Sequence, residues 1–413
     1  MQQASEVDPV GIRVAYGSVP KEGGTFTFYR NHRDEFRTRG IDVRCVAVGT
    51  ESNSLWNPSY ADEGCVRLAP RTWSLRRQVE AFVSWCEVEG IDIVVPVNSR
   101  PILASIPHLP ARVRVISRCA NALHDEYLFA ATGLERVSTV VALTPRLGRD
   151  LTADYAVDPG LIQLIPNGVD TERFDAPPRT STSQRRIELG FLGRLEHRQK
   201  GVLFLPPILQ ALEGSGVDFH LSIGGQGVDE GELRRELAPW VQSGQVSFLG
   251  LLDREVIPGY LASCDVFLFP SQFEGCPNAL LEAMAAGCVP ICWVIEGITD
   301  FIVEDRVTGF LHPLGDAAGM ASSIAEIARG EVEIESMSAR VQEQARARFS
   351  LAECARQYGE VIATALSASP LVDAGLPISR FDPPAWLLRR LPWLPESLRR
   401  SISLLRRRLR RTT

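Results

Sequence analysis

Short apolar runs of strand length alternate with helical patterns from one end of the chain to the other. One series of predicted strands begins at Ile12–Tyr16, and a second begins at Ile187–Gly190. The longer predicted helices are Trp73–Glu89, Pro145–Tyr155, Gly231–Trp240 and Ile334–Ser367. This alternation is typical of parallel sheets with crossover helices. Because it occurs twice, we expect an α/β fold of two doubly wound, Rossmann-like domains facing each other across a cleft, with the site at the carboxyl ends of their strands.

A stretch rich in proline, serine and threonine, residues 175–184, is the predicted linker between the two domains. The expected organisation is an N-terminal domain over residues 1–178 and a C-terminal domain over residues 179–345. A C-terminal helix is expected over residues 346–370, and it could cross back to the N-terminal domain. Residues 371–413 form a basic tail.

Composition places the chain among ordinary globular proteins. The chain has 413 residues, of which 45% are hydrophobic and 23% are charged. The nine cysteines form no CxxC pair and have no metal-ligand spacing, which indicates a reducing compartment. The first residues lack the basic-then-apolar pattern of a signal peptide, and no apolar run approaches the roughly 20 residues that span a bilayer. We therefore expect a cytoplasmic protein.

The C-terminal tail differs in charge from the rest of the chain. Between Arg389 and Arg411 there are nine arginines and one acid, although the net charge of the chain is −6. Leucines at helical spacing, together with Trp386 and Trp393, predict an amphipathic helix from about Pro395. Residues 386–413 are thus expected to lie on an anionic membrane surface. A helix that packs on the protein is the alternative, and the Trp/Leu content argues against a nucleic-acid partner.

Two carboxylates, Glu274 and Glu282, surround the predicted start of a helix. Glu274 follows the apolar strand Val266–Phe269, and Glu282 falls within the predicted helix Ala279–Ala286. Pro277 and the residues after it open this helix, so its free N–H groups face whatever the loop holds, and such groups favour anions. The pattern predicts a ligand that is both anionic and rich in hydroxyls, such as a nucleotide sugar.

Two other loops of the second half follow predicted strands. Arg194 and Lys200 follow the strand Ile187–Gly190, where two cations can hold a diphosphate, and a solvated basic loop is the alternative. Gly224 and Gly225 follow the next strand. They indicate either the close approach of a ligand or a tight turn.

In the first half, Gly23 and Gly24 precede a helix that is expected to start near Thr25, and this loop could contact phosphate or acceptor. The loop lacks the dinucleotide fingerprint, so no nicotinamide cofactor is expected. His124 opens another helix and either projects into the cleft or is structural. We find no Ser/His/Asp motif, no H-E-x-x-H motif and no D-x-D motif in the sequence, and we expect neither a metal nor a cofactor.

The sequence Pro-Ser-x-x-Glu-Gly-x-Pro-x-x-x-x-Glu-Ala-Met-Ala-x-Gly, which contains Glu274 and Glu282, resembles the retaining glycosyltransferases of family 4, which have the GT-B fold. Further motifs of the family appear in order at Ile165–Asp170, Gly193–Gly201, Val246–Gly250 and Thr308–Leu311. The resemblance is strong from about residue 137 to residue 366 and thinner before it. It implies that the N-terminal domain lies on the acceptor side and that the C-terminal domain binds the nucleotide sugar.

The resemblance implies a role for individual residues. Glu282 would accept hydrogen bonds from the ribose, Glu274 and His124 would lie near the transferred sugar, and Arg194 and Lys200 would neutralise the leaving diphosphate. The residues expected at the donor are Glu282, Gly275, Cys276, Asn278, Ala279, Gly225, Leu249, Gly23 and Gly24, with backbone N–H groups of Cys276, Asn278 and Ala279 holding sugar hydroxyls or phosphate.

The implied activity is that of a retaining, metal-independent hexosyltransferase in polysaccharide biosynthesis. It would move a sugar from a nucleotide-diphospho-sugar, with UDP or GDP as the expected nucleotide, to a glycan or lipid-linked acceptor and form an α-linkage. The expected location is cytoplasmic, at the inner face of the membrane. Two alternatives are a nucleotide-sugar epimerase of the same fold and a degenerate member that binds sugar or nucleotide as a scaffold.

Overall fold

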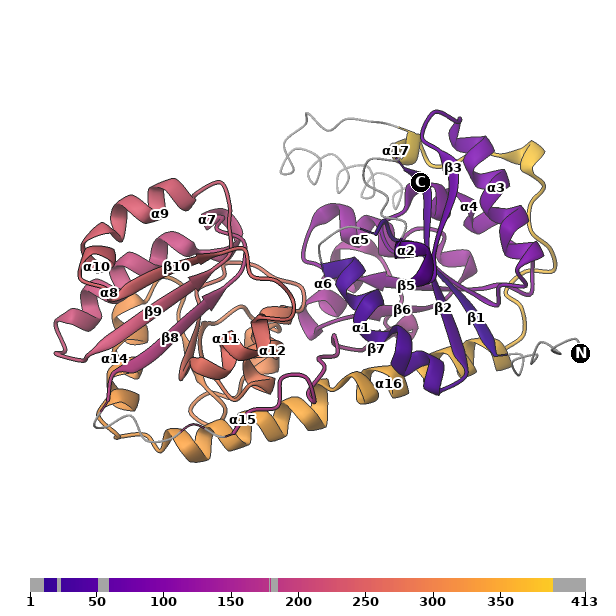
Figure 1. The fold of residues 1–413 in the computed structure, drawn as a ribbon. Coiled ribbons are helices and arrows are strands. Elements are labelled where there is room, and N and C mark those ends of the chain that lie inside the picture. The colour runs from indigo at the N-terminus through magenta and orange to yellow at the C-terminus, as the bar shows by residue number, and fades with distance from the viewer. Residues whose placement is uncertain (1–10, 21–23, 51–58, 178, 180–184, 389–413) are drawn as a thin grey trace, which may run out of the picture. The chain divides into compact units, whose positions relative to one another are not determined.

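The computed structural model of the chain describes residues 11–20, 24–50, 59–177, 179 and 185–388. The chain divides into two compact units. Unit 1 takes its described residues from Met1–Leu143, Leu147–Pro166 and Ala355–Thr413, and unit 2 takes them from Thr144–Arg146 and Asn167–Cys354. Each unit contains a parallel sheet with helices around it (Figure 1), which confirms the predicted α/β class with two Rossmann-like domains.

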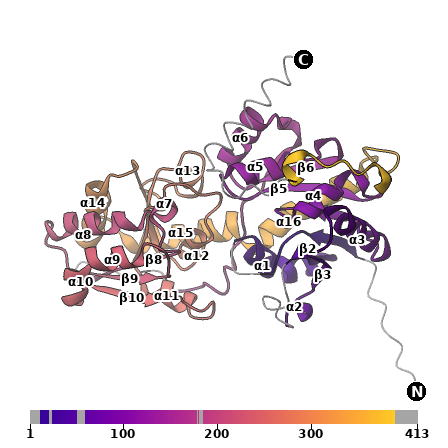
Figure 2. The ribbon, with the colours of Figure 1, turned by 90° about the horizontal axis from the view of Figure 1, so that it is seen from above.

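The sheet of unit 1 has seven parallel strands in the order β3-β2-β1-β4-β5-β6-β7. The strands are β1 (Ile12–Tyr16), β2 (Ile41–Thr50), β3 (Cys65–Pro70), β4 (Ile93–Val95), β5 (Arg114–Cys119), β6 (Val137–Ala142) and β7 (Ile162–Leu164). The helices around it are α1 (Gly24–Thr38), α2 (Ser59–Asp62), α3 (Leu75–Val88), α4 (Arg100–Ser105), α5 (His124–Ala130), α6 (Pro145–Tyr155), α16 (Leu351–Ser367) and α17 (Ala385–Leu388). Figure 2 shows them from above. The order of winding reverses between β1 and β4.

The sheet of unit 2 has six parallel strands in the order β10-β9-β8-β11-β12-β13, so its winding reverses between β8 and β11. The strands are β8 (Ile187–Leu192), β9 (Phe219–Gly224), β10 (Val246–Gly250), β11 (Val266–Phe269), β12 (Val289–Trp293) and β13 (Phe310–His312). The helices are α7 (His197–Lys200), α8 (Leu205–Glu213), α9 (Glu230–Glu236), α10 (Ala238–Gln242), α11 (Ile257–Ser263), α12 (Asn278–Ala285), α13 (Thr299–Ile302), α14 (Ala317–Ala328) and α15 (Ile334–Phe349). Ligands of doubly wound sheets bind where the winding reverses.

Two predicted helices are split in the structure, and one strand escaped prediction. The predicted helix Gly231–Trp240 is divided between α9 and α10, because Pro239, the second residue of α10, has no N–H group with which to continue the hydrogen bonding of α9. Ser350 takes an extended conformation between α15 and α16, and its hydroxyl accepts a hydrogen bond from the N–H of Glu353. Strand β3 lies at the edge of its sheet with only Cys65 buried, so it contains no apolar run to detect.

The boundary between the units differs from the predicted one. The chain passes from unit 1 to unit 2 between Pro166 and Asn167, ahead of the stretch predicted as the linker. Within that stretch, Arg179 is buried in unit 2, where its guanidinium donates to the backbone oxygens of Leu261 at 2.9 Å and Ala286 at 2.8 Å. The composition of this stretch predicts a linker, but its residue Arg179 is bound to unit 2.

The segment after α16 packs on unit 1. The N–H of Leu376 donates to the backbone oxygen of Pro107 at 2.8 Å, and the rings of Phe129 and Trp386 stack with 5.7 Å between their centroids. Leu387 is buried. Residues 389–413, including the helix predicted from about Pro395, lie outside the described residues. Among the described helices, none combines the length and the apolar character needed to cross a bilayer.

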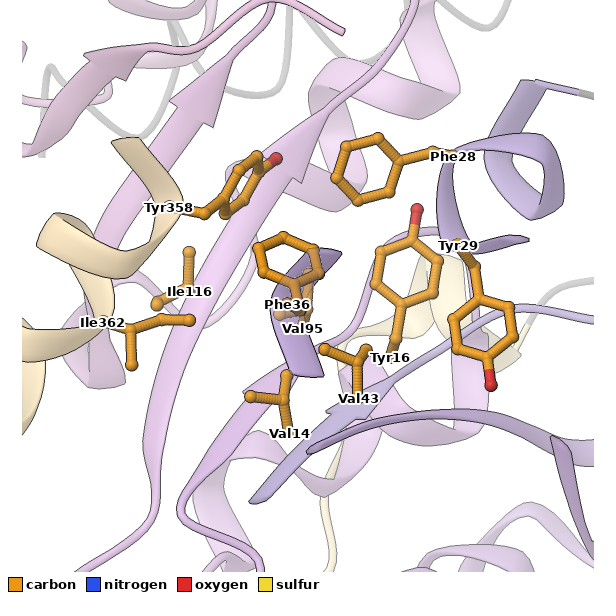
Figure 3. A pocket seen from close by; sticks show the side chains of 10 residues that line it. All are labelled: Val14, Tyr16, Phe28, Tyr29, Phe36, Val43, Val95, Ile116, Tyr358 and Ile362. Atoms are coloured by element: carbon orange, nitrogen blue, oxygen red, sulfur yellow. The ribbon is translucent and has the colours of Figure 1, made fainter. Parts of the chain in front are cut away.

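A small apolar cavity lies in unit 1 between the sheet, α1 and α16 (Figure 3). Its volume is about 20 Å³, enough for about one water molecule. Its lining comprises Val14, Tyr16, Phe28, Tyr29, Phe36, Val43, Val95, Ile116, Tyr358 and Ile362, all of them buried. A nucleotide sugar does not fit this space, so we assign the cavity to core packing.

Candidate active site

The loops after β8 and β11 meet where the winding of unit 2 reverses, and they bring Lys200 and Glu274 together. The Nζ atom of Lys200 lies 2.6 Å from Oε1 of Glu274. Glu274 is only 5% exposed, and Lys200 is largely buried. Because water screens such a pair weakly, the two charges interact more strongly than they would on the surface.

Gln199 extends this pair to Arg194. Its Nε2 atom donates to Oε2 of Glu274 at 3.3 Å, and its Oε1 atom accepts from Nη2 of Arg194 at 2.7 Å. The other terminal nitrogen of Arg194, Nη1, lies 3.1 Å from Oε2 of Glu196. Three of the residues predicted at the site, Arg194, Lys200 and Glu274, therefore belong to one continuous hydrogen-bonded network.

Two glycines allow the loops of this network to approach each other. Gly201 has φ +63°, and a Cβ atom there would lie 1.9 Å from the backbone oxygen of Pro270. Gly225 has φ +133°, and a Cβ atom there would lie 1.8 Å from the backbone oxygen of Gly193. These distances leave no room for a side chain at either position. At Gly225, where a ligand or a tight turn was expected to need the glycine, it is the backbone of Gly193 that comes close.

The start of α12 is held by Asn167, which belongs to the Pro-Asn-Gly-Val-Asp motif. Its Nδ2 atom donates to the backbone oxygen of Cys276 at 3.2 Å and to Oδ1 of Asn278 at 2.8 Å. The first hydrogen bonds back to Pro277 come from Leu280 and Leu281, so the N–H groups of Asn278 and Ala279 precede them. This helix start retains the donors that an anion requires.

Glu282 lies further along α12 in surroundings different from those of Glu274. Burial raises the pKa of its carboxyl to about 7, while the charges of Arg173 and Arg254 act in the opposite direction. The guanidinium of Arg173 also donates to the backbone oxygen of Arg254. The two carboxylates of the motif therefore differ. Glu274 is paired with Lys200, whereas the carboxyl of Glu282 has a pKa of about 7 despite the opposing charges of Arg173 and Arg254.

The remaining predicted donor residues of unit 2 line the same end of its sheet. Gly275 and Cys276 are buried just before α12. Leu249 lies on the edge strand β10 and is 42% exposed, although it is apolar. The N–H of Gly225 donates to the backbone oxygen of Gly250 at 2.7 Å, which ties the loop after β9 to the end of β10.

Three residues predicted at the site belong to unit 1. His124 is buried at the first position of α5, and its Nδ1 atom lies 2.6 Å from the hydroxyl of Tyr155. Gly24 is the first residue of α1, and open space surrounds it. Gly23 lies outside the described residues. The tyrosine contact positions the His124 ring within unit 1.

Sequence reasoning missed four residues that surround the predicted ones, namely Gln199, Asn167, Arg173 and Arg254. Gln199 lies directly before Lys200, and Asn167 lies in the motif Ile165–Asp170. Both belong to recognised motifs, but no spacing in the sequence marks an amide side chain as part of a site. The two arginines belong to segments without any motif. Within the described ranges, no group of three His, Cys, Asp or Glu side chains is arranged to hold a metal ion.

Two family sequence models match the chain, one in each half. The model described as "Glycosyltransferase Family 4" matches residues 22–173, and the model described as "Glycosyl transferases group 1" matches residues 186–329. The second match includes β8, the loop with Arg194 and Lys200, and both carboxylates of the motif. The two matches together thus include every residue of the network described above.

Curated relatives match over part of the chain. An amylovoran biosynthesis glycosyltransferase, AmsK of Erwinia amylovora, is 28% identical over 207 residues, which are 49% of this chain and 50% of the relative. A UDP-Gal:alpha-D-GlcNAc-diphosphoundecaprenol alpha-1,3-galactosyltransferase of Escherichia coli is 30% identical over 188 residues, 43% of this chain and 47% of the relative. The chain spans about half the length of the curated relatives it matches.

Solved structures show the same fold over most of the chain. A glycosyltransferase from Rickettsia africae has a TM-score of 0.70 at 14% identity, covering 87% of this chain and 100% of its own. HepE of Anabaena, in complex with UDP, has a TM-score of 0.69 at 17% identity, covering 86% of this chain and 100% of its own. Family models match both halves of the chain, and each half contains a doubly wound parallel sheet. This chain therefore belongs to the family 4-type glycosyltransferases of the GT-B fold.

Proposed function

We propose that this protein transfers a sugar from a nucleotide-diphospho-sugar to a glycan or lipid-linked acceptor, with retention and an α-linkage, and without a metal ion. The observation that carries the proposal is the network of Arg194, Gln199, Lys200 and Glu274. It lies where doubly wound sheets bind ligands, and it places two cations beside a carboxylate. The cations suit a diphosphate, and the carboxylate suits sugar hydroxyls.

UDP is the nucleotide we propose first. HepE, which has the same fold, was crystallised with UDP and with UDP-glucose, and the galactosyltransferase of Escherichia coli carries UDP-Gal in its name. In this chain, Glu282 would accept hydrogen bonds from the two ribose hydroxyls. The exposed apolar side chain of Leu249 offers a surface for the flat base.

Arg194 and Lys200 would act on the leaving group. As the bond between the anomeric carbon and the phosphate oxygen breaks, negative charge develops on the diphosphate, and fixed cations stabilise it. The acceptor oxygen forms the new bond on the same face of the sugar, and its proton passes to the leaving phosphate. Glu274 would hold the sugar in place, which requires Lys200 to be shared between the carboxylate and the diphosphate.

The acceptor side rests on fewer residues. The galactosyltransferase of Escherichia coli has a diphosphoundecaprenol-linked sugar in its name, and a lipid-linked acceptor of this kind would bring the enzyme to a membrane. We propose that unit 1, with His124, contributes to acceptor and sugar contacts, and that the basic tail after Leu387 binds the anionic inner face of the membrane from the cytoplasm. Trp386 and Leu387 already pack on unit 1, so the membrane contact falls to the residues after them.

A binding screen and a turnover assay test the proposal together. Thermal unfolding of the full chain is followed with UDP, GDP and ADP and with their glucose conjugates. A ligand at 100 times its Kd stabilises by about 2.7 kcal/mol, which is a measurable shift. We expect UDP to stabilise the fold and Glu274→Gln to lower sugar transfer by about 10²–10³-fold while UDP still binds. A protein that binds none of these nucleotides, or a Glu274→Gln variant with full transfer activity, contradicts the proposal.

A further inference from the structure

We propose that Gln199 is a positioning residue of the transfer reaction, whose side-chain amide holds Glu274 and Arg194 in a single arrangement. This inference rests on the proposed function, because it concerns the same site. Gln199 is 7% exposed and is the buried residue of α7. Its two amide atoms are both engaged, one with the carboxylate of Glu274 and one with the guanidinium of Arg194.

The network restricts both oxygens of Glu274. Oε1 accepts from Lys200 at 2.6 Å, and Oε2 accepts from Gln199 at 3.3 Å. Since Gln199 and Lys200 are consecutive, one turn of α7 supplies both donors. A carboxylate held at both oxygens cannot rotate without losing a bond, so the plane of the Glu274 carboxylate is defined by α7.

Arg194 depends on the same amide in a different way. Its side chain is 66% exposed, and an exposed arginine has many conformations of similar energy. The bond of 2.7 Å to Oε1 of Gln199 ties this exposed cation to the buried carboxylate of Glu274. Gln199 thereby keeps the guanidinium at the site at which charge develops on the leaving diphosphate.

An amide is suited to this position because its two neighbours have opposite requirements. Arg194 can only donate a hydrogen bond, and ionised Glu274 can only accept one, so the oxygen of the amide must face Arg194 and the nitrogen must face Glu274. A carboxylate at position 199 would repel Glu274. A cation there would repel Arg194, and an apolar side chain of equal length would leave both without this partner.

The position of Gln199 is itself held by the backbone. Its carbonyl oxygen accepts from the N–H of Gln272 at 2.8 Å, and the side chain of Gln272 donates to the backbone oxygen of His197 at 2.7 Å. The N–H of His197 donates to Asp229 at 2.6 Å. Helix α7 is thus joined to the loop after β11 independently of the Gln199 side chain, so a substitution of that side chain leaves the scaffold in place.

The test uses Gln199→Met, which keeps the length of the side chain but removes both hydrogen bonds. UDP affinity is measured by calorimetry, and turnover is measured as UDP release from UDP-glucose and UDP-galactose with water as acceptor. We expect turnover to fall about 10- to 100-fold, because small misplacements of reacting groups cost such factors, while the Kd for UDP changes by less than about 3-fold. Gln199→Glu should lose more, and should recover in part at acid pH as one of its two neighbouring carboxylates is protonated.

Two comparisons separate positioning from a loss of folding. Gln272→Met removes the side-chain hydrogen bond from the loop after β11 to His197 of α7 and leaves the hydrogen bonds of Glu274 in place. The turnover of this variant should stay within about 3-fold of wild type. In a Glu274→Gln background, Gln199→Met should add less than about 2-fold, because groups that act as a unit are not additive. If Gln199→Met turns over within 2-fold of wild type, the inference is wrong. If the wild-type protein neither binds UDP, GDP or ADP nor turns over their sugars, the proposed function is wrong instead.

Discussion

Lys200 and Glu274 are 74 positions apart in the sequence, and their charged atoms lie 2.6 Å apart in unit 2. Glu274 is almost fully buried. Removing one partner of a buried pair leaves an uncompensated charge, which is more costly than removing both. The pair therefore links the stability of this loop to the chemistry proposed for it.

The variant Lys200→Met should lower the free energy of unfolding of unit 2 by about 3 kcal/mol, because Glu274 stays buried without its cation. Adding Glu274→Gln to it should restore most of this loss, since the unpaired charge is gone, but should not restore sugar transfer. Urea denaturation and UDP release measure the two effects. Equal stabilities of the single and the double variant would contradict this account.

Glu282 should make stability depend on pH. Its carboxyl has a pKa of about 7 in the folded protein and an ordinary value of 4.5, so between these values the folded state binds the proton more tightly than the unfolded state. The stabilisation is complete below about pH 4.5 and is lost as pH rises through 7. It amounts to at most about 3 kcal/mol. Glu282→Gln should remove this slope, and thermal unfolding of both proteins from pH 5 to pH 8 measures it. Parallel curves for the two proteins would argue against it.

The variant Asn167→Ala should loosen the start of α12. It removes the hydrogen bonds from Nδ2 of Asn167 to Cys276 and Asn278, and each such buried bond contributes about 1 kcal/mol. We expect unfolding at a lower temperature and weaker UDP binding, because the donors at the helix start are no longer held. Unaltered UDP affinity in a destabilised variant would limit Asn167 to a structural role.

Gly201→Ala should be much more destabilising than Gly216→Ala, although both positions have positive φ. At Gly216, φ is +71° and no atom lies within 4 Å of the added Cβ, so only the backbone strain of about 1–2 kcal/mol applies. At Gly201 the added atom also meets the backbone oxygen of Pro270 at 1.9 Å. Thermal unfolding compares the two variants, and similar losses would show that α7 can move away from Pro270.

Deleting residues 389–413 should leave the fold of unit 1 unchanged, because Trp386 and Leu387 remain to pack on it. The same deletion should abolish binding to vesicles of phosphatidylglycerol if the arginines bind the membrane surface. Vesicle co-sedimentation and thermal unfolding of the truncated and full chains test both statements. Binding that survives the deletion would assign the membrane contact to another part of the protein.

Much of the fold followed from local patterns. The strands β1 and β11 and the helix α6 have the predicted bounds, since each is an apolar or amphipathic segment with clear ends. Errors arose where the decisive contact was tertiary. Ser350 breaks the long C-terminal helix because the backbone around it pairs with Val169, and Arg179 anchors the proline-rich stretch to unit 2.

The sequence by itself determined that this chain has two Rossmann-like domains, and it singled out Glu274, Glu282, Arg194 and Lys200 as one set, because periodicity and motif spacing are properties of neighbouring residues. Only the tertiary structure decided their partners. Gln199, which lies 75 positions before Glu274, joins that carboxylate to Arg194, and the charges of Arg173 and Arg254 act on the carboxyl of Glu282. The contact between Gln199 and Glu274 depends on where the winding of the sheet reverses, between β8 and β11, because that reversal brings together loops that are far apart along the chain.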